Sequence, residues 1–245
     1  MSIWGKVIGG VTGFAMGGPL GALLGAMAGH AFFDSRQPER DAGAEVDGQR
    51  QVAFTTAVIV LAAKMAKVDG RVTRDEIDAF KRVFHIPPVD MKGIGNLFDK
   101  ARKDAHGFEP YARQIADMFA HEPAVLEELL GGLFHIAQAD GVVNHAELDY
   151  LRRVAAIFGF DARRFDRVHA GAAGPGEGDP YKVMGLTRRA ADAEIKSTYR
   201  RLMREHHPDT LIAQGMPKEF VDVATDKVAA INAAYDRIKA ERGLK

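Results

Sequence analysis

The stretch from Asp192 to Asp209 reads DAEIKSTYRRLMREHHPD, and it decides the fold of the C-terminal part of this 245-residue chain. Its large apolar residues recur at three- and four-residue spacing, so they share one side of a helix; they are Ile195, Tyr199, Leu202 and Met203. Asp192 and Glu194 place negative charge in the first turn, where the helix dipole favours it. We therefore expect a helix over about 192–206, followed by a loop that begins His207-Pro208-Asp209.

Basic residues line the exposed side of this helix at four-residue spacing. Lys196, Arg200 and Arg204 form the stripe, and Arg201 lies beside it. Like charges at this spacing repel one another mildly, and an ordinary solvated face mixes the two signs. An all-basic stripe therefore favours an acidic partner surface.

Two further helices flank this one in the sequence. A short helix is predicted to begin at Pro180 and to end at Gly185. A last helix is predicted over about 218–242, and its inward-facing residues are Phe220, Ala224, Val228, Ile231, Tyr235 and Ile238. The pattern predicts two long antiparallel helices with a short first helix across them.

These residues resemble the J-domain family position for position. The match is carried by Tyr181, Gly185-Leu186, Ile195-Lys196, Tyr199-Arg200, Leu202, His207-Pro208-Asp209, Ile231-Asn232 and Ala234-Tyr235. Two departures are visible: Thr210 stands where many J-domains have lysine, and the loop from Leu211 to Pro217 is longer.

The resemblance implies a mechanism by contact with a DnaK-type chaperone. The expected contact residues are Lys196, Arg200, Arg201, Arg204, His207, Pro208 and Asp209. The basic stripe would dock on an acidic face of the ATPase domain, and Asp209 would pair with an arginine of DnaK. Pro208 would stiffen the turn, and His207 would hold it by a hydrogen bond. The chain would bias a two-state partner without performing chemistry itself.

Residues 51–169 show helical spacing without convincing strand alternation. Two segments repeat at an offset of 71 residues: AKVDGRVTRDEID from Ala66 and AQADGVVNHAELD from Ala137. In each, a helix ends at an Asp-Gly pair, and Thr73 or Asn144 caps the next helix with a glutamate three residues later. We expect an all-α bundle that uses this helix hairpin twice.

The acidic residues of the two repeats are weak candidates for metal ligands. Hard cations take oxygen ligands, and the candidates are Asp69, Glu76, Asp140 and Glu147. The alternating ligands of an EF-hand are missing, and capping and turn chemistry explain these residues without an ion.

The segment resembles the tellurite-resistance TerB family through its Asp-Gly turns and glutamates. That resemblance implies a helical domain linked to metal stress and to interactions at membranes.

The N-terminal segment, residues 1–33, predicts a membrane-spanning helix. The stretch from Val7 to Phe33 contains no residue with a permanent charge. It is long enough to cross a bilayer as a helix. Glycine recurs at every fourth residue: Gly5, Gly9, Gly13, Gly17, Gly21, Gly25 and Gly29. On a helix these form a stripe without side chains, and close packing drives association in lipid. We therefore expect a homodimer joined through this helix.

Two alternatives remain for this segment from its residues alone. Pro19 and the low hydrophobicity of a Gly/Ala-rich stretch also suit a flexible arm. Ala26-Met27-Ala28 also suits the cleavage site of a signal peptide. For a span, Arg36, Arg40 and Arg50 slightly favour the C-terminal side as cytoplasmic.

Composition and charge exclude several other functions. Basic and acidic residues balance at 33 each, so nothing indicates nucleic-acid binding. The absence of cysteine excludes disulfides, thiolate zinc sites and cysteine nucleophiles. His206 and His207 are adjacent, but two histidines without further ligands make a poor metal site. We expect no enzymatic activity and no cofactor.

The expected domains are a membrane segment at 1–33, a linker at 34–50, a TerB-like domain at 51–169, a flexible tether at 170–178 and a J-domain at 179–245. This order resembles the membrane-anchored DnaJ-like co-chaperones of Gram-negative bacteria, on Trp4 to Gly9 and Arg201 to Asp209. The resemblance implies a single-pass inner-membrane protein with cytoplasmic C-terminal domains and a role in stress signalling. A rival reading is a metal-sensing or scaffold membrane protein that uses its J-domain as a recruiting module.

Overall fold

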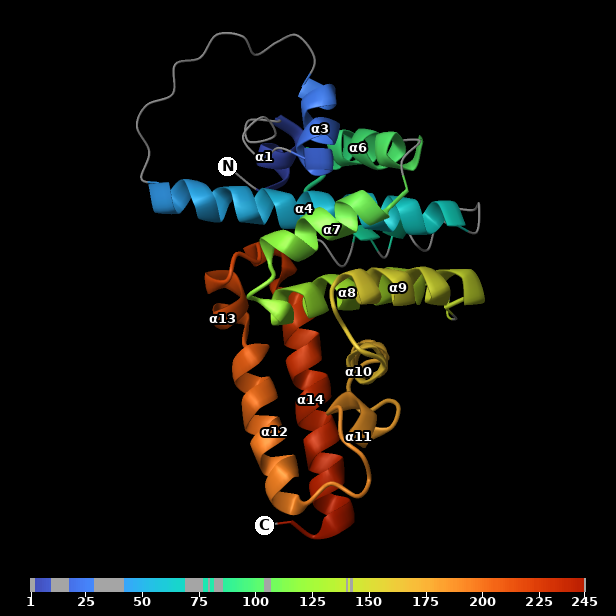
Figure 1. The fold of residues 1–245 in the computed structure, drawn as a ribbon, viewed down its shortest axis with the longest axis vertical. Helices are drawn as coiled ribbons and strands as arrows, with labels where there is room; N and C mark the ends of the chain where they lie inside the picture. The colour runs from blue at the N-terminus through green and yellow to red at the C-terminus, as the bar shows by residue number, and fades with distance from the viewer. Residues whose placement is uncertain are drawn as a thin grey trace.

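The computed structural model describes residues 3–9, 18–28, 42–68, 77–78, 80–81, 86–103, 107–139, 141 and 143–244. Every element of regular structure in these ranges is helical, which confirms the all-α prediction. The helices are α1 (Ile3–Gly9), α3 (Gly18–Ala28), α4 (Ala42–Val68), α6 (Met91–Lys103), α7 (Glu109–Met118), α8 (Pro123–Ala137), α9 (His145–Ile157), α10 (Ala162–Ala172), α11 (Pro180–Val183), α12 (Asp192–Glu205), α13 (Pro208–Ala213), the 3₁₀ turn η1 (Lys218–Phe220) and α14 (Val221–Arg242). Figure 1 shows a long molecule in which a layered bundle sits above the hairpin of α12 and α14.

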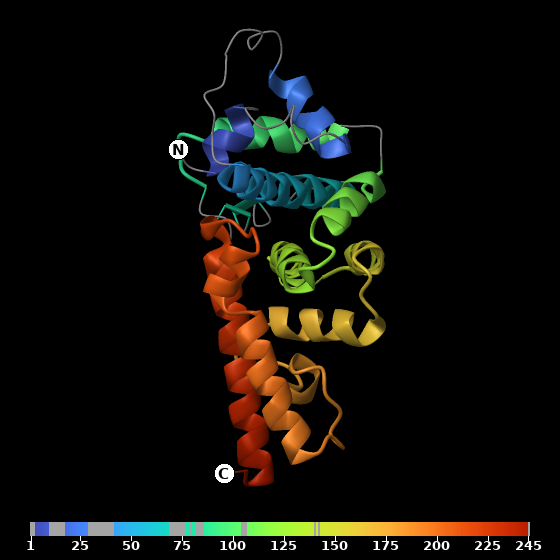
Figure 2. The ribbon, with the colours of Figure 1, turned by 60° about the vertical axis from the view of Figure 1, so that its left-hand side comes forward.

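The centre of the bundle is α4. Its residues from Val52 to Ala66 are buried without interruption, because α1, α3 and α6 cover one side and α7, α8 and α9 cover the other (Figures 1 and 2). Polar groups within it are satisfied locally: the Thr56 hydroxyl donates to the Val52 carbonyl at 2.7 Å. The Tyr150 hydroxyl of α9 donates to the Leu61 carbonyl at 2.8 Å. The helix begins nine residues before the expected boundary at 51, inside the expected linker.

The N-terminal segment contributes two helices to this bundle. Helices α1 and α3 pack against α4, and residues 10–17 between them lie outside the described part of the chain. Pro19 is the second residue of α3, where proline is tolerated because the first-turn N–H groups have no intrahelical partner. The backbone N–H of Leu20 donates to Oε1 of Gln114 on α7 at 2.8 Å.

Among the described residues, one helix is long and apolar enough to cross a membrane. That stretch is Gly48–Val68 within α4, and most of it is buried inside the protein. A buried helix of this kind is the core of a bundle, so its hydropathy alone does not indicate a membrane span.

The second copy of the internal repeat has the predicted capping box. Oδ1 of Asn144 accepts the N–H of Glu147 at 3.0 Å, and the Glu147 carboxylate accepts the N–H of Asn144 at 2.9 Å. The first copy, from Asp69 to Glu76, lies outside the described residues. The helical hairpin is therefore confirmed for the second copy.

The J-domain hairpin has its own apolar core. Ile195 and Leu202 of α12 face Ile231 and Ile238 of α14, and all four are buried. The rings of Tyr199 and Tyr235 stack with 4.1 Å between their centroids. The same buried apolar core also contains Tyr181, Val183, Met184, Ala190, Ala230 and Ala234.

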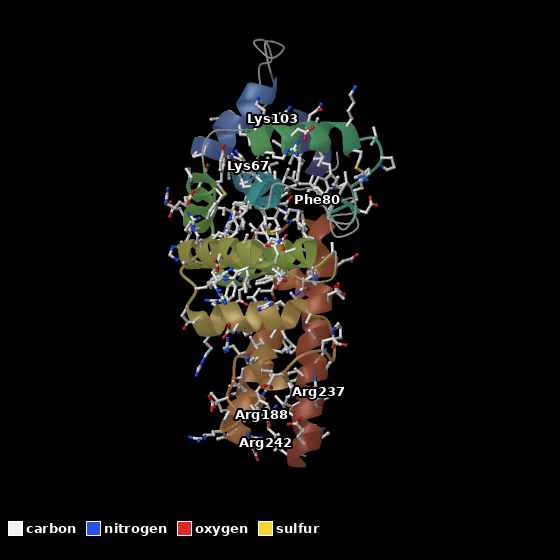
Figure 3. All side chains as sticks on the ribbon, turned by 90° about the vertical axis from the view of Figure 1, so that its right-hand side faces the viewer. Lys67, Phe80, Lys103, Arg188, Arg237 and Arg242 are labelled. Carbon is white, nitrogen blue, oxygen red and sulfur yellow. The ribbon has the colours of Figure 1, made fainter. Side chains whose placement is uncertain are left out.

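Arginines close the end of the hairpin that is far from the bundle. Arg242 donates to the Tyr181 hydroxyl at 2.9 Å and to the Ala190 carbonyl at 2.7 Å. Arg237 donates to the carbonyls of Gly176 and Gly178, and these two hydrogen bonds hold the turn before α11. Figure 3 shows these two arginines at the foot of the molecule, near Arg188.

A buried charged cluster joins the J-domain to the bundle. Glu127 and Glu128 of α8 are almost fully buried, and Lys227 of α14 lies 3.0 Å from the first and 3.3 Å from the second. Nδ1 of His206, at the end of α12, lies 2.7 Å from Oε1 of Glu128. Arg164 and Arg167 of α10 also contact Glu127, which completes a cluster of six side chains. Buried charges need such partners, because an unpaired one carries a large desolvation cost.

Three groups of the cluster have displaced pKa values, and burial lowers that of Arg167. Burial lowers the pKa of His206, the Lys227 ammonium lowers it further, and the hydrogen bond to Glu128 offsets this only in part. Burial alone would raise the pKa of Glu127, but Lys227, His206 and the two arginines hold its pKa well below the usual value. A lowered pKa favours the neutral ring, which meets the Glu128 carboxylate through its Nδ1–H.

We expect the folded state to lose stability as the pH falls below about 6.5, because that is the ordinary pKa of His206 in the unfolded chain. The unfolded chain binds a proton there that the folded chain does not, so stability is full above this pH and declines beneath it. Glu127 adds a second loss of stability below about pH 4.5, the ordinary pKa of a glutamate. There the unfolded chain binds a proton that the folded chain, in which this pKa is lowered, does not. Urea unfolding of the detergent-solubilised chain at about pH 5.5 and 7.5 measures the first window.

The variant His206→Asn isolates the histidine's share, because an asparagine amide can donate from the position of Nδ1 but does not titrate. His135 and His169 also have pKa values lowered by burial, so they keep part of the pH dependence in this variant. The slope of stability against pH should become smaller. An unchanged slope would show that His206 is not buried in this environment.

Candidate functional site

The His207-Pro208-Asp209 turn lies directly after α12 and differs in form from the expected loop. Pro208 and Asp209 are the first residues of a short helix, α13. Three local features explain the helix. His207 has the extended backbone that a residue before proline prefers (φ −62°, ψ 131°), its Nδ1 accepts the N–H of Asp209 at 3.2 Å, and Pro208 suits a first turn. The expected hydrogen bond by His207 is therefore present, within a helical cap.

The side chains of this turn are presented to solvent while its backbone is held. The Asp209 side chain is 89% exposed and that of His207 is 54% exposed. Leu211, two residues after Asp209, is fully buried. The turn is thus a short rigid element that carries an exposed carboxylate.

The basic stripe of α12 is present on the neighbouring surface. Arg200 and Arg204 are exposed and Lys196 is half-buried. The Nε–H of Arg200 donates to the Lys196 carbonyl at 3.2 Å, which holds the base of that side chain along the helix. This arrangement concentrates positive charge beside the turn.

Arg201, the fourth expected contact, lies in a different environment. It pairs with Glu205 at 2.7 Å and lines a cleft of about 580 Å³ between the J-domain and the bundle. The cleft is also lined by Arg163, Arg164, Arg167, Glu122 and Asp161. Lys196, Arg200 and Arg204 therefore share the helix that leads into the turn, whereas Arg201 lines the cleft shared with the bundle.

The two adjacent histidines point to different places. His206 is fully buried against α8, whereas His207 is exposed at the cap of α13. Nε2 of His206 has no hydrogen-bond partner among the described residues. The pair therefore does not form one site.

The weak metal candidates fall mostly outside the described residues. Asp69, Glu76 and Asp140 are not described, and the Glu147 carboxylate caps α9. Within the described ranges, no group of three or more acidic or histidine side chains is arranged to hold a metal ion.

Sequence reasoning missed the charged cluster on α8. Two consecutive glutamates, Glu127 and Glu128, stand within an otherwise apolar helix and are buried with it. Because buried acids need partners, this pattern was the available signal for a contact with another part of the chain. The partners, His206 and Lys227, are about 80 and 100 residues away in sequence, so spacing could not identify them.

Three family models match successive parts of the chain. Residues 1–48 match the family model for the co-chaperone DjlA transmembrane domain, residues 55–170 that for tellurite resistance protein TerB, and residues 179–242 that for the DnaJ domain. The first match supports a membrane-anchored protein, and the third supports a J-domain co-chaperone with a DnaK-type partner. No solved structure matches the chain.

Curated relatives match over the full length. A protein named co-chaperone protein DjlA from Shewanella oneidensis is 35% identical, and the alignment covers 100% of both chains. Proteins of the same name from Coxiella burnetii and Photobacterium profundum are 32% and 29% identical, over 98% and 99% of this chain and 98% and 100% of theirs. Their names describe co-chaperones, which suggests a regulatory role. The chain therefore belongs to the DjlA family of membrane-anchored J-domain co-chaperones.

Proposed function

We propose that this protein recruits a DnaK-type chaperone and stimulates its ATP hydrolysis through the His207-Pro208-Asp209 turn and the basic stripe of α12. The observation that carries the proposal is the exposed carboxylate of Asp209 on a turn held at both ends. A side chain on a fixed backbone loses less conformational freedom on binding than one on a mobile loop.

The two parts of the site have separate tasks. Lys196, Arg200 and Arg204 attract an acidic surface of the ATPase domain, which speeds encounter and sets the orientation of docking. Asp209 then pairs with an arginine of DnaK and favours the arrangement that hydrolyses ATP. The co-chaperone contributes differential contacts to a partner that has two states, so no reacting group is required on this chain.

Substituting His207→Gln should abolish the stimulation of DnaK ATP turnover, because the ring nitrogen that accepts the Asp209 N–H is lost and the turn is no longer held. Steady-state phosphate release measures this effect, and circular dichroism checks that the helices remain. The control is His145→Gln, since His145 is exposed on α9. Stimulation that persists in the His207 variant would refute the contact mechanism.

Reversing the stripe with Arg200→Glu and Arg204→Glu should raise the half-saturating concentration of this protein by about tenfold, with little change in maximal turnover. Replacing two attractive charges by two repulsive ones weakens docking and changes its dependence on salt. A titration against DnaK at low and high ionic strength separates these effects. Arg189→Glu is the matched control, because Arg189 is exposed on the loop between α11 and α12. An equal rise in the half-saturating concentration for the control would show that net charge, and not the position of the stripe, sets the affinity.

We further propose that the N-terminal segment leaves its position on α4 and anchors the protein in the bacterial inner membrane, with the later domains in the cytoplasm, where DnaK and ATP are found. The glycine stripe would join two copies there. Gly5 and Gly9 lie in α1, and Gly21 and Gly25 lie in α3. Gly13, Gly17 and Gly29 lie outside the described residues.

In phospholipid vesicles, Gly25→Ile should weaken self-association, because a branched side chain separates two helices that pack through glycine. Energy transfer between donor- and acceptor-labelled copies reports the dimer. Ala26→Ile adds similar bulk one position away and should preserve the signal. Equal energy transfer in both variants would place the contact elsewhere.

A further inference from the structure

The segment that follows the His-Pro-Asp turn is buried in the bundle and not in the J-domain's own core. Leu211, Met216, Phe220 and Ala224 are buried and belong to the apolar cluster built around α4, α7 and α8. The ring of Phe220 meets the edge of Phe54 at 4.9 Å between centroids. The longer loop that distinguishes this J-domain is therefore the part that enters the bundle.

Close backbone approach fixes the position of this segment. Gly215 has φ +98°, a conformation that favours glycine. A Cβ at this position would lie 3.2 Å from Cβ of Arg50 and 3.4 Å from the ring of Phe119. The loop backbone therefore rests directly on α4 and on the end of α7.

The charged cluster forms a second anchor on the other side of the turn. Glu128 contacts only J-domain residues in that cluster, accepting from His206 at 2.7 Å and lying 3.3 Å from Lys227. Oε2 of Glu128 and Nε2 of His206 have no hydrogen-bond partners in the described structure. The two side chains share one hydrogen bond, and loss of either partner would leave a buried polar group uncompensated.

The two anchors bracket the tripeptide. His206 directly precedes His207, and Leu211 follows Asp209 after one residue. We infer that the J-domain is docked on the TerB-like bundle, which is called its seat below, and that the two domains move as one body. Glu128 is then a positioning residue, which holds the His-Pro-Asp turn in its DnaK-competent form. This inference rests on the proposed function for its effect on ATP turnover, but not for the seat itself.

Loss of the seat should act on apparent affinity more than on maximal turnover. When only a fraction of molecules present a competent turn, the apparent dissociation constant rises by the inverse of that fraction. DnaK at saturation still selects the competent form. Release of the J-domain would instead improve stimulation if the bundle inhibited it, so the sign of the effect distinguishes positioning from inhibition.

The experiment measures the seat and its effect in the full-length chain. The chain has no cysteine, so spin labels attach only at introduced ones. Arg113→Cys on α7 and Asp236→Cys on α14 are exposed positions in the two domains. Double electron–electron resonance in vesicles should give one narrow distance distribution. Glu128→Gln and Lys227→Met should each add a broad component, and should raise the half-saturating concentration in the DnaK assay at least about threefold.

Two control variants carry the same chemical changes at exposed positions. Glu194→Gln lies on α12 and Lys239→Met lies on α14. Both should retain the narrow distribution and the parental titration.

Each outcome bears on one part of the inference. A broad distribution in the parent would overturn the seat, and a narrow one in both cluster variants would overturn the positioning role of Glu128. A broadened distribution with unchanged or improved stimulation would overturn the positioning role of Glu128. If the parent does not stimulate DnaK at all, the proposed function fails, and the distance measurement still decides whether the J-domain is seated.

Discussion

The contact between the Glu128 carboxylate and the His206 ring is the interaction on which the arrangement of the two domains depends. A carboxylate inside an apolar helix is tolerated only where compensating groups meet it. Here those groups come from the J-domain, from both of its long helices. Glu127 is compensated by two arginines of the bundle as well, so α10 and the J-domain converge on the same turn of α8.

Apolar packing beside this cluster supplies the nonspecific part of the attachment. Full burial of a phenylalanine side chain is worth about 2 kcal/mol, and Phe220 is 3% exposed among aromatic side chains of the bundle. Packing of this kind brings surfaces together without choosing one register. The buried charges choose the register, because a shifted arrangement would leave them unpaired.

Local signals made much of the fold predictable from the sequence. The periodicity of α12 and α14, the proline at the start of α11 and the capping box at Asn144 each report on neighbours within a few residues. The same signals failed where a distant partner decided the outcome. The tripeptide begins a helix and not a loop because His207 caps it and Leu211 is anchored in the bundle. Helix α4 extends to Ala42 within a segment whose polar composition suggested a linker.

The candidate site was predictable in composition and only partly in geometry. Spacing placed Lys196, Arg200 and Arg204 on one stripe, and the structure agrees. It could not show that Arg201, one position along, turns toward a cleft shared with the bundle. Hydropathy has a similar limit, since the most membrane-like stretch among the described residues, Gly48–Val68, is the core of the bundle.

The backbone of Gly215 against Arg50 and Phe119 bears on how interchangeable J-domains are. Swapping such domains between proteins assumes a self-contained module whose only obligatory part is the tripeptide. In this chain, a donor domain with a shorter connection before the last helix would bring the tripeptide but no residues to pack against α4 and α7. A chimera joined at the start of the J-domain would thus carry the tripeptide without the packing that holds it in place. A functional chimera would have to exchange the complementary bundle surface at the same time.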